Sequence, residues 1–268
     1  MHALLLFIIV SYNVENFFCT AHKEESIARV LTHIGEWQGP DIIALQEVEN
    51  DTVVQRLCRK LRNNEYAYVH YDSPDQRGID VALIYKKALV DTLRTQAIPV
   101  HLGTETTRDI LYVCAQVLTP AQRTDTLHLF VCHLPSQRGG KAESNWKRER
   151  AKQTIQQAVD SVRTTQPHAK IIVMGDMNAV PKQDLDGLNN RMKGLQGTHK
   201  HHGQWACLDQ FYTSPTLDSL SSVRIYDAEW IQVTDETYLG LKPNRTAYNH
   251  HTQSTFSDHL PIILELLY

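Results

Sequence analysis

The sequence predicts a fold of helices and strands, α/β or α+β, in which two β-sheets pack together. Many short apolar runs of strand length are separated by turn residues, and about three segments show the spacing of amphipathic helices. Strands and helices do not alternate strictly, so one parallel sheet is not favoured. The 268 residues are 42% hydrophobic with no long biased tract, and polar motifs extend from end to end. This predicts a single domain over residues 1–268.

Composition limits the partners and the compartment. The formal net charge is −3, so binding of a polyanion would have to be local. Five cysteines without a CxxC motif indicate free thiols in a reducing compartment, which favours a cytoplasmic location over secretion. The apolar run from Ala3 to Val10 has the length of a signal-peptide core, but no Lys or Arg precedes it. We interpret it as a buried strand, and no stretch is long enough to span a bilayer.

In the N-terminal half, hydrophobic spacing predicts each element in turn. A helix over residues 24–37 follows the first strand, and its core-facing stripe consists of Ile27, Val30, Leu31, Ile34 and Trp37. Gly39 and Pro40 end this helix. The next elements are a strand over 41–46, a helix over 51–62, and strands over 66–71, 79–86, 89–100, 109–119 and 126–132.

The C-terminal half is predicted in the same way. A helix over 143–163 carries Trp146, Ile155, Val159 and Val162 on one side. Strands over 170–175 and 205–213 flank a surface excursion over 182–204 that is rich in Gly, Asn, Lys and His, and weak alternation over 222–234 precedes a loop over 242–251. The last strand follows Pro261, which has no N–H and belongs at the first residue of a strand or on an edge.

Five of the apolar segments adjoin polar residues suited to phosphate chemistry. The first four lead to Asn13, Glu47, His133 and Asp176, and the last follows the pair Asp258 and His259. Mg²⁺ prefers carboxylate and amide oxygens, and phosphates accept hydrogen bonds from amides and imidazoles. The set therefore indicates metal-assisted hydrolysis of a phosphoester.

In this order and spacing, the motifs SYNVENFF, DIIALQEVEN, VCHLPSQ, GDMNAVP and SDHLP resemble the endonuclease/exonuclease/phosphatase family, the DNase I-like superfamily of phosphohydrolases. GDMN and SDHLP together are highly specific, and the motifs cover nearly the whole chain. The resemblance implies a four-layer α/β/β/α sandwich, with two packed mixed β-sheets flanked by helices and the site at one end of the sheets. It also implies Mg²⁺ as the cofactor, with Mn²⁺ able to substitute.

The resemblance assigns metal and phosphate binding to particular residues. Glu47 is the expected main Mg²⁺ ligand, and Asp258 matches a position that helps to hold the metal in relatives. Asn13 matches a residue that supports metal or phosphate binding. His133 is expected to bind the phosphate and to aid protonation of the leaving group, and its presence is unlike the branch of abasic-site endonucleases. Because a glutamate after an apolar strand is usually a solvated strand end, these roles depend on the resemblance.

Proton transfer is assigned to a second set of residues. His259 is expected to act as a general base or to polarise the phosphate, since an imidazole titrates near neutral pH. Asp209 matches the aspartate that orients this histidine in relatives. Asp176 is expected to position or activate the nucleophile or leaving group, and Asn178 is expected to bind a phosphate oxygen. Alternation along an extended chain places Asp176 and Asn178 on one face.

The sequence leaves the substrate open. We predict a nuclease acting on DNA or RNA, and the alternatives are hydrolysis of a phospholipid head group, an inositol phosphate or a small nucleotide, or a binding protein without activity. The densest basic stretch consists of Arg138, Lys141, Lys147, Arg148, Arg150 and Lys152. A solvated helix face is the simpler interpretation, and a phosphate-contact patch with Arg138 as a substrate-binding residue is the alternative. We expect a monomer without a stable protein partner.

Two other groups receive structural interpretations. His199, His201 and His202 could bind a transition metal, but neither a cysteine nor a fixed ligand spacing supports this. Arg77 precedes the strand over 79–86, in a region that lines the site in relatives, and a structural role is the better assignment.

Overall fold

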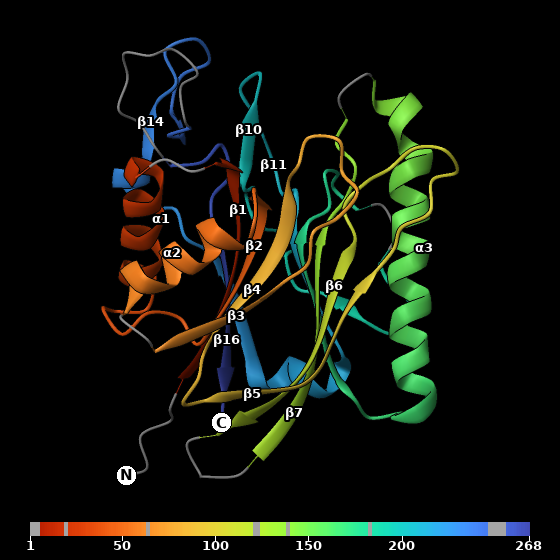
Figure 1. Ribbon diagram of the computed structural model, residues 1–268. Helices are drawn as coiled ribbons and strands as arrows, with labels where there is room; N and C mark the ends of the chain where they lie inside the picture. Colours follow the sequence, from red (N-terminus) through yellow and green to blue (C-terminus); the bar gives the residue numbers. More distant parts are fainter. Residues whose placement is uncertain are drawn as a thin grey trace.

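The computed structural model describes residues 6–18, 21–62, 65–119, 124–137, 140–181, 184–245 and 256–268 and has four layers (Figure 1). Helices α1 (Ala21–Ile34) and α2 (Asp51–Leu61) cover one six-stranded sheet, and α3 (Lys141–Thr165) covers a second. The two sheets pack against each other between the helical layers. The α/β/β/α sandwich implied by the resemblance is therefore confirmed.

Both sheets mix parallel and antiparallel pairs. The first sheet has the order β13 (Ser221–Ile225), β16 (Ile262–Leu267), β1 (Leu6–Phe17), β2 (Ile42–Val48), β4 (Asp80–Lys86) and β3 (Tyr66–His70). The second has the order β5 (Val90–Ile98), β6 (Ile110–Leu118), β7 (Thr124–His133), β8 (Lys170–Asp176), β12 (Asp209–Thr213) and β9 (Asn189–Asn190). The neighbours β1 and β2 are parallel, as are β7 and β8. Each parallel pair therefore brings two strand ends, and the residues after them, to one edge of its sheet.

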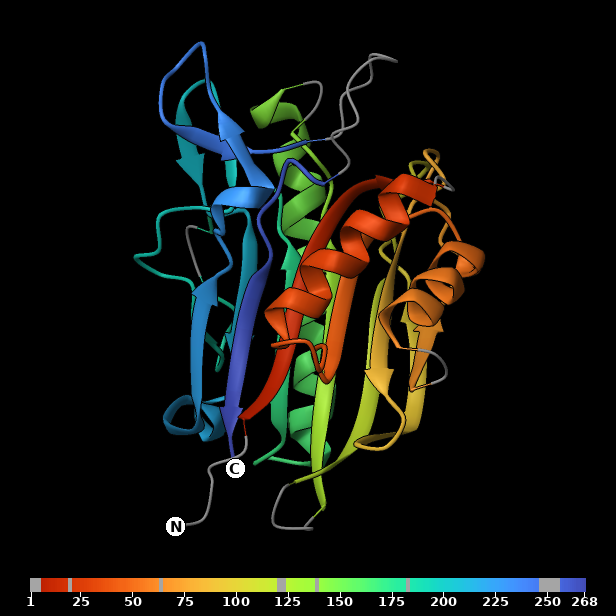
Figure 2. The same ribbon diagram turned by 90° about the vertical axis from the view of Figure 1, so that its left-hand side faces the viewer.

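Two small hairpins project from the molecule at the end opposite the C-terminus (Figures 1 and 2). One pairs β10 (His199–His201) with β11 (Gln204–Ala206), and the other pairs β14 (Gln232–Thr234) with β15 (Leu241–Pro243). Two 3₁₀ turns, η1 (Pro215–Leu220) and η2 (Glu229–Ile231), complete the regular structure. The hairpins thus stand at the same end as the C-terminal ends of β1 and β2.

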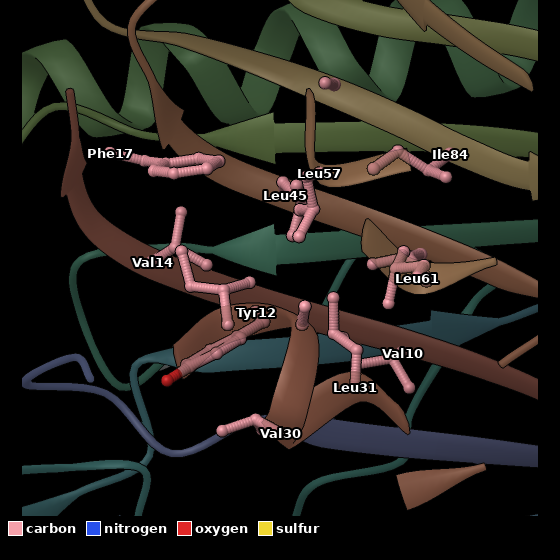
Figure 3. Close-up of a cluster of buried hydrophobic side chains, with 14 of the residues drawn as sticks. Val10, Tyr12, Val14, Phe17, Val30, Leu31, Leu45, Leu57, Leu61 and Ile84 are labelled. Carbon is pink, nitrogen blue, oxygen red and sulfur yellow. The ribbon is translucent and has the colours of Figure 1, made fainter. Parts of the chain in front are cut away.

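Three apolar layers hold the sandwich together. One lies between α1, α2 and the first sheet and includes Tyr12, Leu31 and Leu45 (Figure 3). The second lies between the sheets, and the third lies between the second sheet and α3. The start of α2 is fixed by Asn50, whose side chain accepts hydrogen bonds from the backbone N–H groups of Thr52 and Val53.

Two tryptophans do not lie where helical spacing predicted them. Trp37 is 69% exposed because α1 ends at Ile34, before the predicted stripe reaches it. Trp146 is 48% exposed because the buried face of α3 runs through Ser144, Arg148 and Ala151 instead. In both helices the remaining stripe residues are buried or half-buried.

The C-terminal half differs most from the prediction. The segment 182–204 is not only a surface excursion, because its described residues include β9, β10 and three buried side chains, Leu185, Leu188 and Met192. The predicted strand over 205–213 is divided, since β11 belongs to a projecting hairpin and β12 to the second sheet. The predicted loop over 242–251 begins within β15, and residues 246–251 lie outside the described residues.

The described cysteines carry free thiols. Cys58, Cys114, Cys132 and Cys207 are free, and Cys19 lies outside the described residues. None of the helices in the described ranges is long and apolar enough to cross a membrane.

The core between the sheets gives a test of the packing. Leu129 on β7 is fully buried there, so Leu129→Ala should lower the free energy of unfolding by about 2–5 kcal/mol through lost burial and a residual cavity. Leu93→Ala on β5, where the side chain is 55% exposed, should change it by less than about 0.5 kcal/mol. Urea denaturation measures both, and equal effects would contradict the assigned packing.

Candidate active site

The polar residues at the ends of β1, β2, β7 and β8 meet at one edge of the sandwich. Asn13 Nδ2 donates a 3.0 Å hydrogen bond to Asp176 Oδ2, which joins the first sheet to the second. His133 Nε2 lies 3.6 Å from Asp176 Oδ2 and 3.8 Å from Glu47 Oε1. His259 Nε2 lies 3.8 Å from the same oxygen of Asp176. Asn13, His133 and His259 thus lie around the carboxylate of Asp176, and Glu47 adjoins this group through His133.

Irregular backbone at the strand ends directs these side chains. Glu47 has φ +65° at a register shift between β2 and β4, and Glu15 and Asn16 have φ +45° and +48° at a shift between β1 and β2. Asn178 has φ +51° just after β8. Left-handed conformations cost a residue other than glycine about 1–3 kcal/mol, and bulges re-aim the side chains that follow. The gathering of four such residues here is the mark of a functional site.

Close contact between β7 and β8 sets the pair of His133 and Asp176. The two residues are direct partners in the parallel register. A Cβ atom at Gly175 would lie 1.9 Å from the carbonyl oxygen of Cys132. Only glycine therefore lets the strands approach this closely immediately before the two polar side chains.

Asp209 and His259 form a buried hydrogen-bonded pair. Asp209 Oδ2 lies 2.7 Å from His259 Nδ1, and the Asp209 side chain is buried at the start of β12. The backbone N–H of His259 donates to Ser257 Oγ at 3.1 Å, and that of Asp209 donates to Thr198 Oγ1 at 3.3 Å. The pairing expected from the resemblance is present as a contact, and it turns Nε2 of the imidazole toward Asp176.

The carboxylates and the imidazole shift one another's pKa. Burial alone would lower the pKa of His259, but the carboxylates of Asp209 and Asp176 outweigh it and raise the pKa well above its ordinary value. Burial raises the pKa of Asp176 to about 7, and the charge of Asp209 adds to this, whereas His259, the Asn178 N–H and Asn13 lower it. The raised pKa of His259 favours its protonated imidazole, a form that can donate a hydrogen bond to a phosphate.

His133 is a neutral imidazole. Burial, followed by the charges of Arg108, Arg77 and His259, lowers its pKa well below the ordinary value. Arg108 is itself buried, donates hydrogen bonds to the carbonyl oxygens of His133 and Leu134 at 3.3 and 2.8 Å, and thereby fixes the backbone after β7. A neutral imidazole can donate one hydrogen bond to a phosphate, but it is a poor acid for a leaving group.

Glu47 is arranged to offer one oxygen to a cation. Its Oε2 accepts hydrogen bonds from the Asn16 N–H at 2.8 Å and from Arg77 at 3.3 Å. Its Oε1 faces His133 at 3.8 Å, beyond hydrogen-bonding distance. Because Mg²⁺ usually keeps several waters and takes one or two carboxylates from the protein, this oxygen fits such an ion.

Asp258 stands apart from Glu47 among the described side chains. Its Oδ2 lies 3.4 Å from Arg245 and 3.9 Å from His199, and its N–H donates to Glu15 Oε2 at 3.1 Å. In the described ranges, two groups of three residues have possible ligand atoms within 4.8 Å of one another. The first group is Asp176, Asp209 and His259. The second group, His70, Asp72 and Asp80, lies on β3, the loop after it and β4. Neither contains Glu47 or Asp258, so the two expected metal ligands do not share such a group with a third described side chain.

Asn178 supports Asp176 rather than facing outward. Its amide nitrogen donates to Asp176 Oδ2 at 3.1 Å and to the carbonyl oxygen of Leu134 at 2.9 Å. Its backbone N–H donates to Asp176 Oδ1 at 2.7 Å. Since both amide hydrogens are engaged within the protein, the expected contact with a phosphate oxygen requires the amide to turn.

Several residues of the site carry no clear signal in the sequence. Arg77, interpreted above as structural, contacts Glu47, and Arg245 contacts both Glu15 and Asp258. The ring of His199 lies 4.9 Å from that of His259, and burial lowers the pKa of His199 to about 4. Of these residues, Glu15 could have been predicted from the sequence, because it lies two residues after Asn13 in the same motif.

The predicted basic stretch does not form one track toward the site. Lys147 pairs with Glu105, and Arg150 Nε donates to the carbonyl oxygen of His101 at 3.4 Å. Arg148 is 3% exposed and donates to the carbonyl oxygen of Pro135 at 3.2 Å. Arg138, the predicted substrate-binding residue, lies outside the described residues. The cations whose contacts are described serve the loops around α3.

Comparisons with known proteins show the family and the fold of the chain. A family model described as "Endonuclease/Exonuclease/phosphatase family" matches residues 19–267. No curated protein matches the sequence. Among solved structures, the chain is similar to truncated Caenorhabditis elegans TDP2, with a TM-score of 0.67, 16% identity and 98% of each chain covered.

Two further structures illustrate the range of similar proteins. The mannosyl-6-phosphatase Bt3783 of Bacteroides thetaiotaomicron has a TM-score of 0.63 and 14% identity, with 98% of this chain and 100% of that chain covered. TDP2 of D. rerio, complexed with a single-strand DNA product, has a TM-score of 0.62 and 16% identity, with 98% and 99% covered. At these identities the likeness shows the fold alone.

The contact between Asp209 and His259 can be tested by a double-mutant cycle. Asp209→Asn and His259→Ala should each lower kcat by about a hundredfold or more, and the double variant should be little worse than His259→Ala alone. Removing the Asp209 charge should also lower the pKa of His259, so its NMR titration and the matching limb of the kcat/KM profile should move to lower pH. Strictly additive losses would mean that the two residues act independently.

Proposed function

Because the chain belongs to the endonuclease/exonuclease/phosphatase family, we propose that it is a Mg²⁺-dependent phosphodiesterase with one catalytic domain over residues 1–268. The observation that carries this proposal is that His133 and His259 lie 3.6 and 3.8 Å from the buried carboxylate of Asp176, while Glu47 lies 3.8 Å from His133. An edge with a carboxylate oxygen of Glu47 turned toward His133, and with two imidazoles whose pKa values are lowered (His133) and raised (His259), suits an anionic phosphate. It suits a neutral substrate poorly.

Glu47 and Asp258 are the proposed ligands of the ion. A bound Mg²⁺ would neutralise charge on the non-bridging oxygens of the phosphate. Arg77 holds Glu47 Oε2 at 3.3 Å and so keeps Oε1 turned into the site. Arg245, 3.4 Å from Asp258 Oδ2, restrains the second carboxylate in the same manner.

The remaining residues bind the phosphate and move protons. The imidazolium of His259 donates a hydrogen bond from Nε2 to a non-bridging oxygen, and Asp209 holds the proton at Nδ1. Asp176, with a pKa of about 7, accepts a proton from the attacking water, while Asn13 keeps its carboxylate in place. His133 donates a second hydrogen bond to the phosphate. General acid–base groups of this kind typically contribute about 10²- to 10⁴-fold to the rate.

We propose nucleic acid as the substrate to be tested first. The D. rerio TDP2 structure of the same fold contains a single-strand DNA product, which supports a polynucleotide. A small phosphoester is the second candidate, and two observations favour it: the scattered basic side chains of α3, and the same fold in a mannosyl-6-phosphatase.

Metal dependence is tested by chelation. EDTA should abolish turnover of an aryl phosphodiester, and added Mg²⁺ or Mn²⁺ should restore it. Glu47→Gln should raise the Mg²⁺ concentration needed for half-maximal rate by about tenfold or more, because it removes a charged hard ligand. Glu36→Gln, at an exposed glutamate, is the matched control. Full activity in thoroughly chelated buffer would end the metal assignment.

The substrate class is decided by a panel of single-stranded DNA and RNA, duplex DNA, an aryl phosphodiester and sugar phosphates. A nuclease should turn over an oligonucleotide with a kcat/KM at least about tenfold above that for the aryl diester, because extra contacts bind the longer chain. Turnover of sugar phosphates without cleavage of nucleic acid would select the second candidate.

A further inference from the structure

A row of aromatic rings leads from His259 to the tip of the projecting hairpins. His199 lies 4.9 Å from His259 between ring centroids, and His201 lies 6.3 Å from His199 with an interplanar angle of 26°. His202 follows at 4.1 Å from His201, and Tyr238 at 5.8 Å from His202. We call His199, His201, His202 and Tyr238 the aromatic row. Its spacings of about 4–7 Å are those of interacting rings.

The hairpin of β10 and β11 builds most of this row from local sequence. Strand alternation places His199 and His201 on one face and Lys200 on the other. His202 and Gly203 form the two-residue turn, both with positive φ (+47° and +77°), as such a turn requires. A Cβ atom at Gly203 would lie 2.8 Å from Cβ of Tyr238, so the glycine lets the second hairpin complete the row.

Lys200 makes the projecting end rigid. Its side chain is 5% exposed and pairs with Asp235 at 3.1 Å. Its Nζ also donates to the carbonyl oxygens of Leu239 at 2.7 Å and Leu241 at 3.2 Å. The turn between β14 and β15 is thereby fixed against β10, and a preformed surface loses little entropy when a ligand binds to it.

The row is also tied to the active site. His199 and His259 form an isolated antiparallel bridge, and the backbone N–H of Leu260 donates to the carbonyl oxygen of Thr198 at 2.8 Å. The inner end of the row therefore keeps its position relative to the imidazole that faces the phosphate. A ligand lying on the row would place its next group beside His259.

Neither core packing nor metal binding explains the outer rings. His201 and His202 are exposed, and Tyr238 is 47% exposed. In the described part of the chain, neither of the two possible metal-binding groups includes His199, His201 or His202. Exposed planar side chains in contact with one another, beside a phosphate site, offer faces to a planar ligand.

We propose that the aromatic row stacks the bases of single-stranded nucleic acid and so presents a phosphodiester to His259. This deepens the proposed function and rests on it. Aromatic rings stack on any base, because every base has a π-face. Duplex bases are already stacked and paired, so their faces are closed to the row. Asp235 does not repel the strand, since Lys200 and Lys242 both pair with it.

The test uses fluorescence anisotropy and steady-state kinetics with labelled oligothymidylate and oligouridylate of about twelve nucleotides. His201→Ala and Tyr238→Ala should each raise Kd and KM for these strands by about tenfold, the usual loss for one stacked base. His201→Phe and Tyr238→Phe should retain the affinity of the wild type. The kcat and KM for a small aryl phosphodiester should stay unchanged, because it is too short to reach the outer rings.

Two controls separate stacking from other effects. His168→Ala removes an exposed histidine just before β8, at the opposite end from the site, and should leave Kd unchanged. An abasic strand of the same length should bind weakly and be insensitive to His201→Ala. Equal Kd values for the wild type and both alanine variants, or no binding of single strands at all, would overturn the aromatic row as a binding surface.

The outcome also separates this inference from the proposed function. Brisk turnover of the aryl phosphodiester without binding of single strands would remove the row and leave phosphodiester hydrolysis standing. Binding that depends on His201 and Tyr238 but occurs without hydrolysis of any phosphodiester would keep the row and refute the proposed chemistry.

Discussion

The carboxylate of Asp176 is the point on which the rest of the site depends. It is buried at the end of β8, accepts a hydrogen bond from Asn13 on the other sheet, and lies within 4 Å of His133 and His259. Apolar packing between the sheets is not directional, so it fixes their relative position only loosely. The hydrogen bond across the sheets supplies the missing direction. Without it, His133 and His259 would lose the carboxylate that lies near both of them.

Several residues of the site adopt backbone conformations that are locally unfavourable. Glu47, Asn178 and the residues that follow Asn13 adopt left-handed backbone conformations, which are unfavourable for side chains other than glycine. Burial of the Asp176 charge adds a further cost, which its raised pKa expresses. Burial of apolar side chains in the three layers offsets the free-energy cost of the left-handed conformations and of the buried Asp176 charge. A strained site on a stable core is expected of an enzyme. The site needs side chains that point away from regular strands, and the stability of the core offsets the cost of these conformations.

Charge is placed locally rather than over the surface. The chain is mildly acidic overall, yet two cations are placed beside the site residues, since Arg77 contacts Glu47 and the buried Arg108 holds the backbone at His133. The basic residues of α3 whose contacts are described are engaged with neighbouring loops instead. Long-range attraction of a polyanion is thus weak. Affinity for a strand would then have to come from short-range contacts such as stacking, which salt screens little.

The sequence by itself determined the elements and much of the site. Hydrophobic periodicity predicted the helices and the long strands, because buried faces repeat at fixed spacing. The polar residues at the strand ends predicted a site for phosphoester hydrolysis, and the structure places Asn13, His133 and His259 around Asp176. Periodicity misplaced Trp37, because a helix end depends on local hydrogen bonds rather than on the stripe. Only the tertiary structure decided that Arg77 reaches Glu47 and that His199 packs on His259, since loops distant along the chain supply these partners. Periodicity reports which face of a segment is buried, whereas a contact between loops depends on where two folded sheets place their ends.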